Sequence, residues 1–283
     1  MTALVFVLVV GSAFLHAGWN ALLKRHPDPE GAAPGVFAVC AAGGAVAAAL
    51  WPGGRASGAV VAWSAAAGLF EAGYIFTLSR ALSLAPLGPV YTVSRGGALL
   101  VVWPLSVAWL GERVTVAALA GTALVAAGLA ATGLGAGGIR RRDGAAAGLR
   151  WAGIAAACIG CYHLAYKQAL AAGGAPGLVF AVSLGVAVPL NLARLDRAGR
   201  RGARRAARDR PALIVSAGII SCASFLVFLV ALAQAGAGAV FTLRNTSVLF
   251  AQAMSWALGE RPTRLGALGA AAVAGGAALL SWP

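Results

Sequence analysis

The chain is long, apolar and basic. Its 283 residues are 60% hydrophobic and only 11% charged, with a formal net charge of +14 and a mean hydropathy of +0.83. Soluble domains carry about 25% charged residues, so this composition excludes a soluble protein and predicts an all-α integral membrane protein. The basic residues gather in loops, above all in 194–210 with its eight Arg. This placement indicates orientation in the membrane and contact with anionic lipid headgroups rather than nucleic-acid binding.

Ten segments are apolar enough to be transmembrane helices, because one crossing takes about 20 apolar residues. They span 3–23, 34–51, 58–80, 87–110, 115–133, 150–171, 177–193, 212–234, 237–258 and 265–282. We expect the first five in residues 1–135 and the second five in 149–283. The segment 136–148 between them is rich in Gly and Arg, which is typical of a flexible linker.

The first predicted helix carries His16, Asn20 and Lys24 at a spacing of four, so the three side chains lie along one face. Trp19 stands beside them. Lys24 is at the helix end, where its ammonium group can reach the membrane interface. His16 and Asn20 are therefore the candidates for facing a cavity.

The third predicted helix contains Glu71, with Tyr74 three residues later. Glu71 is the one acidic residue that we place deep in the membrane. One interpretation is that it neutralises Arg95 or Arg244, and another is that it is a protonatable coupling group. The two interpretations are compatible.

The fourth predicted helix places Tyr91 one turn before Arg95. A charge at membrane depth costs roughly 2.5 to 3.5 kcal/mol on insertion scales and is normally kept for a pathway or a binding site. Gly96 and Gly97 follow, where the helix can unwind or pack tightly, and Pro104 predicts a kink. Interrupted helices often mark a transporter's substrate site.

The second half repeats these features. The predicted helix 150–171 carries Tyr162, His163 and Lys167 in the pattern of the aromatic, polar and Lys positions of the first helix. The predicted helix 237–258 has Arg244 and Ser247 along one side, with Asn245 on a neighbouring stripe.

The clearest repeat pairs Val90–Arg113 with Val240–Arg261. Each segment begins with Val, an aromatic residue, Thr and an aliphatic residue, carries one internal Arg, and ends Leu-Gly-Glu-Arg. Self-similarity over such a long period indicates duplication and two structural halves.

The basic residues also predict orientation. The connections that follow the first, third, fifth, seventh and ninth predicted helices, with the adjoining helix ends, hold 17 of the 22 Lys and Arg residues. The positive-inside rule therefore puts these loops, including 194–210, in the cytoplasm and both termini outside the cell membrane.

Chemistry at a metal or cofactor is not expected. Cys158 and Cys161 form a CxxC pair, which can mean redox or metal chemistry. No second CxxC accompanies the pair and its surroundings are apolar, so we interpret both residues as packing residues and predict no metal and no cofactor.

Several stretches together resemble the EamA family of the drug/metabolite transporter superfamily: HAGWNALLK at 16–24, SRG at 94–96, RNTSVLFA at 244–251 and the two LGER endings. The resemblance implies two inverted five-helix repeats around a central cavity, alternating access, and export of small metabolites or amphipathic compounds. The chain has Thr92 and Asn245 where the most similar branch is expected to have Pro and Glu. The superfamily is usually described with cytoplasmic termini, opposite to the charge distribution here.

We therefore predict a secondary, proton-coupled exporter of an amino-acid-like or anionic metabolite, acting as a monomer or homodimer. The expected substrate-binding residues are Arg95, Arg244, Tyr91, Tyr74, Asn245, Ser247, Asn20, Trp19, Tyr162 and His163, with Glu71 as the coupling residue.

Two alternatives compete with this prediction. An exporter of lipophilic cations would need an excess of carboxylates, whereas Arg95, Arg244 and Lys167 outnumber Glu71 here. Such a cationic cavity favours substrates with a carboxylate or phosphate. An intramembrane enzyme acting on lipids would need paired acids, an HExxH helix or a Ser/His constellation, and none is evident, so we predict that the chain is not an enzyme.

Overall fold

The computed structural model describes residues 2–51, 53–110, 115–137, 144–235, 237–261 and 263–280. Within these ranges the chain is helical, and its β-type pairing is a single isolated bridge between Gly54 and Gly174. The predicted all-α class is thus confirmed. The helices are α1 (Ala3–Arg25), α2 (Pro29–Leu50), α3 (Gly58–Leu84), α4 (Leu87–Leu110), α5 (Val116–Gly137), α6 (Ala145–Ala171), α7 (Pro176–Ala193), α8 (Arg197–Asp209), α9 (Pro211–Gln234), α10 (Ala237–Arg244), α11 (Ser247–Ala257) and α12 (Arg264–Leu280).

Short polar side chains determine where several helices begin. The Thr2 hydroxyl accepts a hydrogen bond from the Val5 amide, and the Asp28 carboxylate accepts one from the Gly31 amide. These bonds satisfy amide groups that have no partner within the helix. Pro176 occupies the first turn of α7, where its missing amide hydrogen costs nothing.

Among the described residues, six helices are long and apolar enough to cross a membrane: α1, α2, α3, α6, α7 and α9. Shorter apolar stretches lie in α5 (Leu119–Thr132) and α12 (Arg264–Leu279). Large hydrophobic side chains such as Leu4, Val7 and Ile219 are exposed on the outside of the bundle, as expected of a surface in contact with lipid. The chain is a multi-pass membrane protein.

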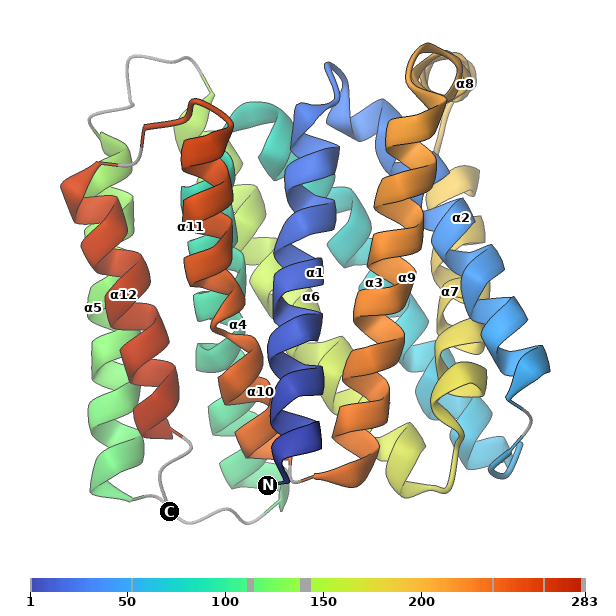
Figure 1. Ribbon diagram of the computed structural model, residues 1–283, viewed down its shortest axis with the longest axis horizontal. Coiled ribbons are helices and arrows are strands. Elements are labelled where there is room, and N and C mark those ends of the chain that lie inside the picture. The colour runs from blue at the N-terminus through green and yellow to red at the C-terminus, as the bar shows by residue number, and fades with distance from the viewer. Residues whose placement is uncertain are drawn as a thin grey trace.

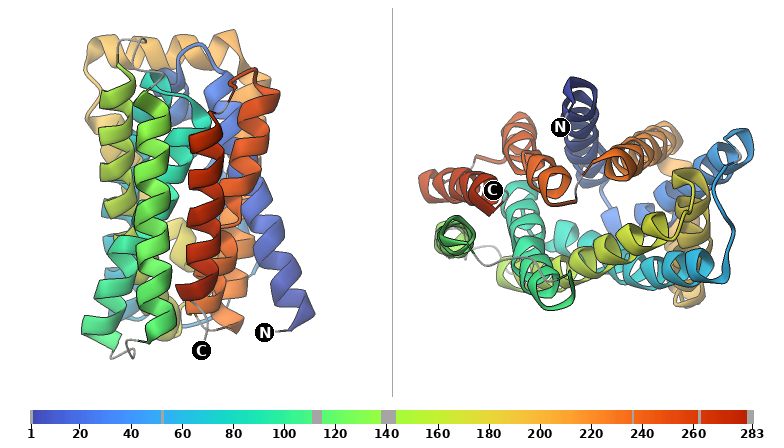
Figure 2. Two further views of the ribbon diagram at one scale, coloured as in Figure 1. Left: turned by 90° about the vertical axis from the view of Figure 1, so that its left-hand side faces the viewer. Right: turned by 90° about the horizontal axis from the view of Figure 1, so that it is seen from below.

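The spanning helices run roughly side by side, while α8 lies crosswise over one end of the bundle (Figure 1, Figure 2). The start of α1 and the end of α12 lie at the opposite end (Figure 1). We refer to these two ends as the α8 end and the terminal end.

Helices from the two halves of the sequence are packed against each other. Helix α3 packs on α6 as α9 packs on α1, and α4 packs on α6 as α11 packs on α1. The α1–α9 contact includes a reciprocal pair of hydrogen bonds, in which the Ser12 hydroxyl donates to the Ser224 carbonyl at 3.0 Å and the Ser224 hydroxyl donates to the Ser12 carbonyl at 2.9 Å.

Helices α5 and α12 form a close pair at one side of the bundle (Figure 1). A Cβ atom on Gly128 would lie 2.6 Å from the Gly269 carbonyl oxygen, and one on Gly276 would lie 2.7 Å from the Gly121 carbonyl oxygen. Small residues allow such close approach of helix backbones in membranes.

The prediction of one continuous helix over 237–258 is wrong. It is divided at Asn245 and Thr246 into α10 and α11. At the break the Thr246 amide donates to the Leu243 carbonyl at 3.1 Å, and the Val248 amide donates to the Asn245 carbonyl at 2.9 Å. These bonds span three residues instead of four and tighten the backbone locally.

Helix α4 is not unwound at Gly96 and Gly97. A Cβ atom on Gly96 would lie 2.9 Å from a Val273 side-chain carbon, and one on Gly97 would lie 2.9 Å from the Ala156 Cβ. The two glycines therefore allow α4 to pack closely against α12 and α6. Of the two possibilities stated for this pair, unwinding and tight packing, the structure has tight packing.

Two further expectations concern connections. The Arg-rich segment 194–210, expected as a loop, contains the helix α8. The expected linker 136–148 is shorter, because α5 extends to Gly137 and α6 begins at Ala145. Residues 138–143 of this linker lie outside the described residues. The same holds for residues 111–113, the last three of the first Leu-Gly-Glu-Arg ending.

Candidate functional site

The polar residues singled out in the sequence lie inside the bundle rather than against lipid. Each is buried in the structure: Arg95, Arg244, Tyr91, Tyr74, Asn245, Ser247, Asn20, Trp19, Tyr162, His163 and Glu71. They come from helices α1, α3, α4, α6, α10 and α11 and from the break between α10 and α11, so residues far apart in the sequence share one central region.

Arg244 lies at the end of α10, directly before the helix break, and only 1% of its surface is exposed. Its Nη2 is 3.2 Å from Nδ1 of His16. Its guanidinium carbon lies 3.7 Å from the centre of the Phe228 ring and 5.3 Å from that of Phe225. Aromatic faces attract a cation electrostatically. Nε and Nη1 have no hydrogen-bond partner, so this buried cation keeps two donor groups unused.

His16 connects Arg244 to α1. Its Nδ1 also lies 3.2 Å from the indole Nε1 of Trp19. Indole and guanidinium N–H groups can only donate, so Nδ1 is the acceptor and the ring hydrogen belongs on Nε2. The Asn20 amide donates to the His16 carbonyl at 2.8 Å, while its Oδ1 has no partner. A neutral imidazole thus holds one edge of the Arg244 guanidinium group.

Arg95 on α4 shares a cavity with Arg244. The cavity is also lined by His163, Phe241 and Asn245, and its volume is about 20 Å³. A space of that size holds about one water molecule. Arg95 is 4% exposed, its guanidinium carbon lies 5.9 Å from the centre of the Tyr91 ring, and its Nη2 has no partner. The cavity is too small for a metabolite in this conformation.

An aromatic wall borders the two Arg residues. The Tyr74 and Tyr162 rings are 5.5 Å apart, and His163 stacks on Phe241 at 4.9 Å with an interplanar angle of 21°. The Tyr91 and Tyr162 hydroxyls and His163 Nε2 have no hydrogen-bond partner. These buried polar groups are available to a ligand or to water.

Glu71 contacts neither of the two Arg residues, Arg95 and Arg244, that the sequence offers as its partners. Its carboxylate accepts a hydrogen bond from the Ser183 hydroxyl of α7 at 2.7 Å, and the Tyr166 side chain lies beside it. Three ion pairs occur among the described residues, and none of them contains Glu71, Arg95 or Arg244. The expected pairing of Glu71 with an Arg is therefore wrong for this conformation. A hydroxyl can donate to a carboxylate or accept from a carboxylic acid, so Ser183 suits Glu71 in both protonation states.

The helix break adds two polar residues to the site. The Asn245 side chain donates to the Phe241 carbonyl at 3.4 Å and lines the cavity, while the buried Ser247 hydroxyl has no partner. Phe225, Phe228 and Ser183 were not singled out in the sequence. An isolated Phe or Ser in an apolar helix carries no distinguishing signal, and only the packing of α7 and α9 reveals their contacts.

A second polar cluster closes the α8 end. Lys24 Nζ donates to the carbonyls of Leu82 and Ala85 at 2.6 and 2.8 Å, and lies 3.7 Å from Glu260 Oε1. Glu260 Oε2 accepts from the Leu87 amide at 2.8 Å. The Ser255 hydroxyl also donates to Glu260 Oε2, at 2.7 Å. We call Lys24, Glu260, Ser255 and the backbone groups that they bind the Lys24–Glu260 clamp. The partly exposed Lys24 ammonium group is therefore bound to other segments of the chain at this end.

No metal-binding group emerges in the described part of the chain. Clusters of three or more His, Cys, Asp or Glu side chains that could hold an ion are absent from it. Cys158 and Cys161 are free thiols, each partly exposed.

Taken together, the bundle and its polar centre define a class, that of helical multi-pass membrane proteins with a buried cationic site. Residues 146–282 match the model of the EamA-like transporter family, which confirms over those residues the resemblance expected from the sequence. A search of curated proteins found no significant match. A solved crystal structure of a protein aligns with a TM-score of 0.64 and 20% identity, over 97% of this chain and 96% of the other, and supports the fold alone.

Proposed function

We propose that the protein is a secondary transporter that exports a small anionic or amino-acid-like metabolite by alternating access. The observation that carries the proposal is the pair of Arg residues at one cavity, because both are nearly fully buried and neither forms an ion pair with a described residue. Buried charges are normally paired. A substrate carboxylate or phosphate would supply the missing partner through charge-assisted hydrogen bonds.

The proposal includes ten membrane crossings arranged as two inverted repeats. Helices α10 and α11 together would make one crossing, and α8 would lie at the membrane surface. Five crossings in each half invert the second half relative to the first. The matching helix contacts, α3 on α6 and α9 on α1, support such a pairing.

Alternating access also needs a contact that opens and closes. The Lys24–Glu260 clamp joins the end of α1 and the α3–α4 turn to the segment after α11. We place the gate of the α8 end there, and an opening toward that end would separate Lys24 from Glu260.

The competing transport function, export of lipophilic cations, receives less support. Such a substrate would meet two Arg cations at the cavity, while Glu71 is hydrogen-bonded to Ser183 and does not line the cavity. Binding a cation there would place like charges together in a medium of low dielectric.

Substrate binding by the purified full-length protein tests the proposal. A thermal-shift screen of carboxylates, phosphates and lipophilic cations should give stabilisation by an anionic compound. Arg244→Gln and Arg95→Gln should each weaken that binding by at least about tenfold, since a charge-assisted hydrogen bond contributes about 1.5 to 3 kcal/mol. The control Arg55→Gln removes an exposed Arg from the connection between α2 and α3 and should bind normally. Normal binding by both central variants, or selective stabilisation by cations, would refute the anionic site.

A further inference from the structure

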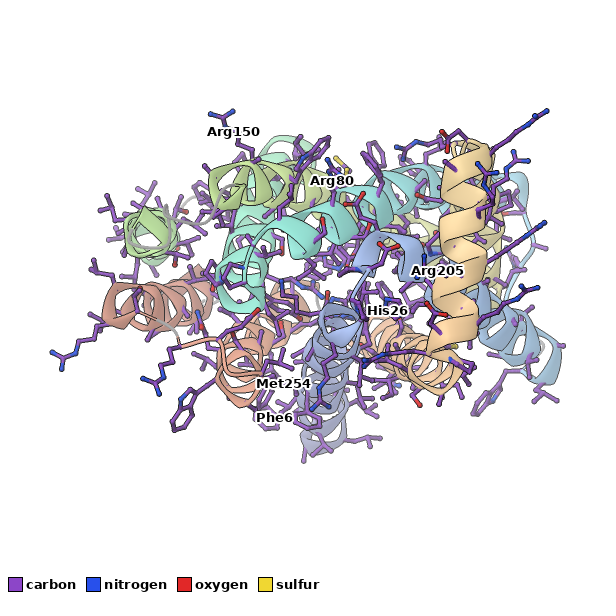
Figure 3. The ribbon with its side chains drawn as sticks, turned by 90° about the horizontal axis from the view of Figure 1, so that it is seen from above. Phe6, His26, Arg80, Arg150, Arg205 and Met254 are labelled. Atoms are coloured by element: carbon purple, nitrogen blue, oxygen red, sulfur yellow. The ribbon has the colours of Figure 1, made fainter. Side chains whose placement is uncertain are left out.

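Helix α8 is firmly attached to the bundle although most of its surface is exposed. Ala206 is 3% exposed, and its carbonyl oxygen lies 3.3 Å from Nε2 of His26. The Asp196 carboxylate caps the start of the helix by accepting from the Gly199 amide at 2.7 Å. Figure 3 looks onto the α8 end and shows α8 crossing it, with His26 and Arg205 labelled. The helix is therefore a fixed platform at the level where the spanning helices end.

This platform is strongly basic. Its exposed Arg residues are Arg197, Arg200, Arg201, Arg204, Arg205 and Arg208. Within the described residues, the ion pair on this helix joins Arg205 to Asp209 at 3.5 Å. The other five Arg residues carry no ion pair with a described side chain.

A groove lies between α8 and the end of α7. Its apolar lining comes from Leu192, Ala193 and Leu195, and its polar lining from Arg200 and Arg204, with Ala203 between them. The groove encloses about 340 Å³. Arg200 and Arg204 are four residues apart, so they lie on one face of α8.

The groove is apolar toward the membrane and basic at the level of α8. Arg200 Nε donates to the Leu195 carbonyl at 3.0 Å, which holds this side chain over the α7–α8 connection. On α7, Leu190 and Leu192 are 39% and 43% exposed. Leu190 lies about 200° around the helix from Leu192 and faces away from the groove. The partly buried Val188, one turn before Leu192, shares its face and continues the apolar lining along α7.

We propose that this groove is a binding site for an anionic phospholipid. The lipid phosphate would lie between the guanidinium groups of Arg200 and Arg204, and an acyl chain would follow Leu192 and Val188. Arg side chains bind phosphate through paired N–H groups, and basic pockets at the membrane surface bind anionic headgroups. The apolar lining suits an amphiphile better than a free phosphate ion. The site is independent of the transport function proposed above.

Lipid binding to the purified full-length protein tests this site. Native mass spectrometry and thermal shift would compare phosphatidylglycerol, phosphatidylcholine and inorganic phosphate. We expect phosphatidylglycerol to bind at least tenfold more tightly than phosphatidylcholine and to raise the unfolding temperature, with inorganic phosphate unable to displace it. The double variant Arg200→Gln/Arg204→Gln should lose most of this preference.

Two further variants separate a built site from general surface charge. Arg197→Gln/Arg201→Gln removes the same charge from the same helix outside the groove and should keep most of the preference. Ala203→Leu keeps every charge but fills the groove, and should weaken phosphatidylglycerol binding without weakening the general attraction to anionic vesicles. Equal losses in the two double variants would reduce the site to a charged surface. Displacement by inorganic phosphate would make it a phosphate site, and normal lipid binding by Ala203→Leu would also overturn the proposal.

Discussion

Glu71 and Arg244 are both buried, yet different kinds of side chain hold them. Arg244 rests on Phe228 and donates to the neutral His16, while Glu71 accepts from Ser183. Because the acid and the cation are not joined to each other, each can change its partner separately. Under the proposed function, a substrate anion would occupy Arg244 while a proton occupies Glu71.

Glu71→Gln imitates the protonated carboxyl group and should leave substrate binding within about threefold of wild type, because no charge-assisted bond to substrate, about 1.5 to 3 kcal/mol, is removed. Counterflow exchange in proteoliposomes should persist, since it needs no net proton movement. Uphill transport under a pH gradient should be lost. Wild-type uphill transport with unchanged pH dependence would show that coupling lies elsewhere.

Ser183→Ala tests how Glu71 is held. The variant removes the hydroxyl that donates to the carboxylate at 2.7 Å. Leaving a buried polar group without a partner costs about 1 to 3 kcal/mol, so the unfolding temperature should fall. The pH profile of transport should also shift relative to wild type. A matched Ser64→Ala variant, in which the lost bond goes to the Val60 carbonyl of the same helix, should leave the profile unchanged.

At the scale of elements, apolar length and small-residue content were enough to predict the all-α membrane class and the boundaries of several helices. The position of the interruption was not predictable. Gly96 and Gly97 left open whether α4 unwinds or packs tightly there, whereas the observed break follows Arg244, at Asn245 and Thr246. The Thr246 hydroxyl donates to the Leu243 carbonyl at 2.7 Å and supports the break. Thr makes similar bonds inside regular helices, so the sequence does not distinguish the two cases.

The same limit applies to the site. Arg95, Arg244 and Glu71 stood out because charges are rare at membrane depth. Their partners could not be assigned, because Phe228, His16 and Ser183 come from three other helices, and only His16 was a candidate for facing the cavity. Which helices meet in the centre is a property of packing across the two halves, and spacing along one helix does not reveal it.

The α5–α12 contact gives a prediction about stability. Gly128→Ala adds a methyl group whose carbon would lie 2.6 Å from the Gly269 carbonyl oxygen. The two helix backbones must therefore separate, and the unfolding temperature should fall. Gly153→Ala in α6 is the matched control, because a Cβ atom there meets nothing within 4 Å. It should be neutral or stabilising, since Ala is favoured over Gly in a helix by roughly 0.5 to 1 kcal/mol. Equal unfolding temperatures for the two variants would contradict the close packing.

For the whole molecule, the basic α8 end and the terminal end differ in charge, and this difference predicts orientation. In a protein without native Cys, a single Cys at Ala207 should resist a membrane-impermeant maleimide in intact cells, because the positive-inside rule places α8 in the cytoplasm. A single Cys at Ser57, near the terminal end, should react. The opposite labelling pattern would place the termini in the cytoplasm.

The Lys24–Glu260 clamp predicts how one end opens. Glu260→Gln keeps an acceptor for the Leu87 amide but loses the charge that faces Lys24 at 3.7 Å. In inside-out vesicles, a single Cys at Ser247 should then react with N-ethylmaleimide several-fold faster. Glu30→Gln breaks the exposed Arg80–Glu30 pair at the same end and should leave the rate unchanged. Identical rates in all three proteins would exclude the clamp as a gate.

The reciprocal Ser12–Ser224 hydrogen bonds also bear on how the chain is made. The two residues are separated by 212 positions, and α1 has its main contacts with α9 and α11. At synthesis rates of about 5 to 20 residues per second, α1 precedes α9 by roughly 10 to 40 seconds. During that interval the polar face of α1, with Ser12, His16 and Asn20, has none of its partners from the second half. Insertion of this protein therefore requires that the first helix stay accessible in the membrane until the ninth has been synthesised.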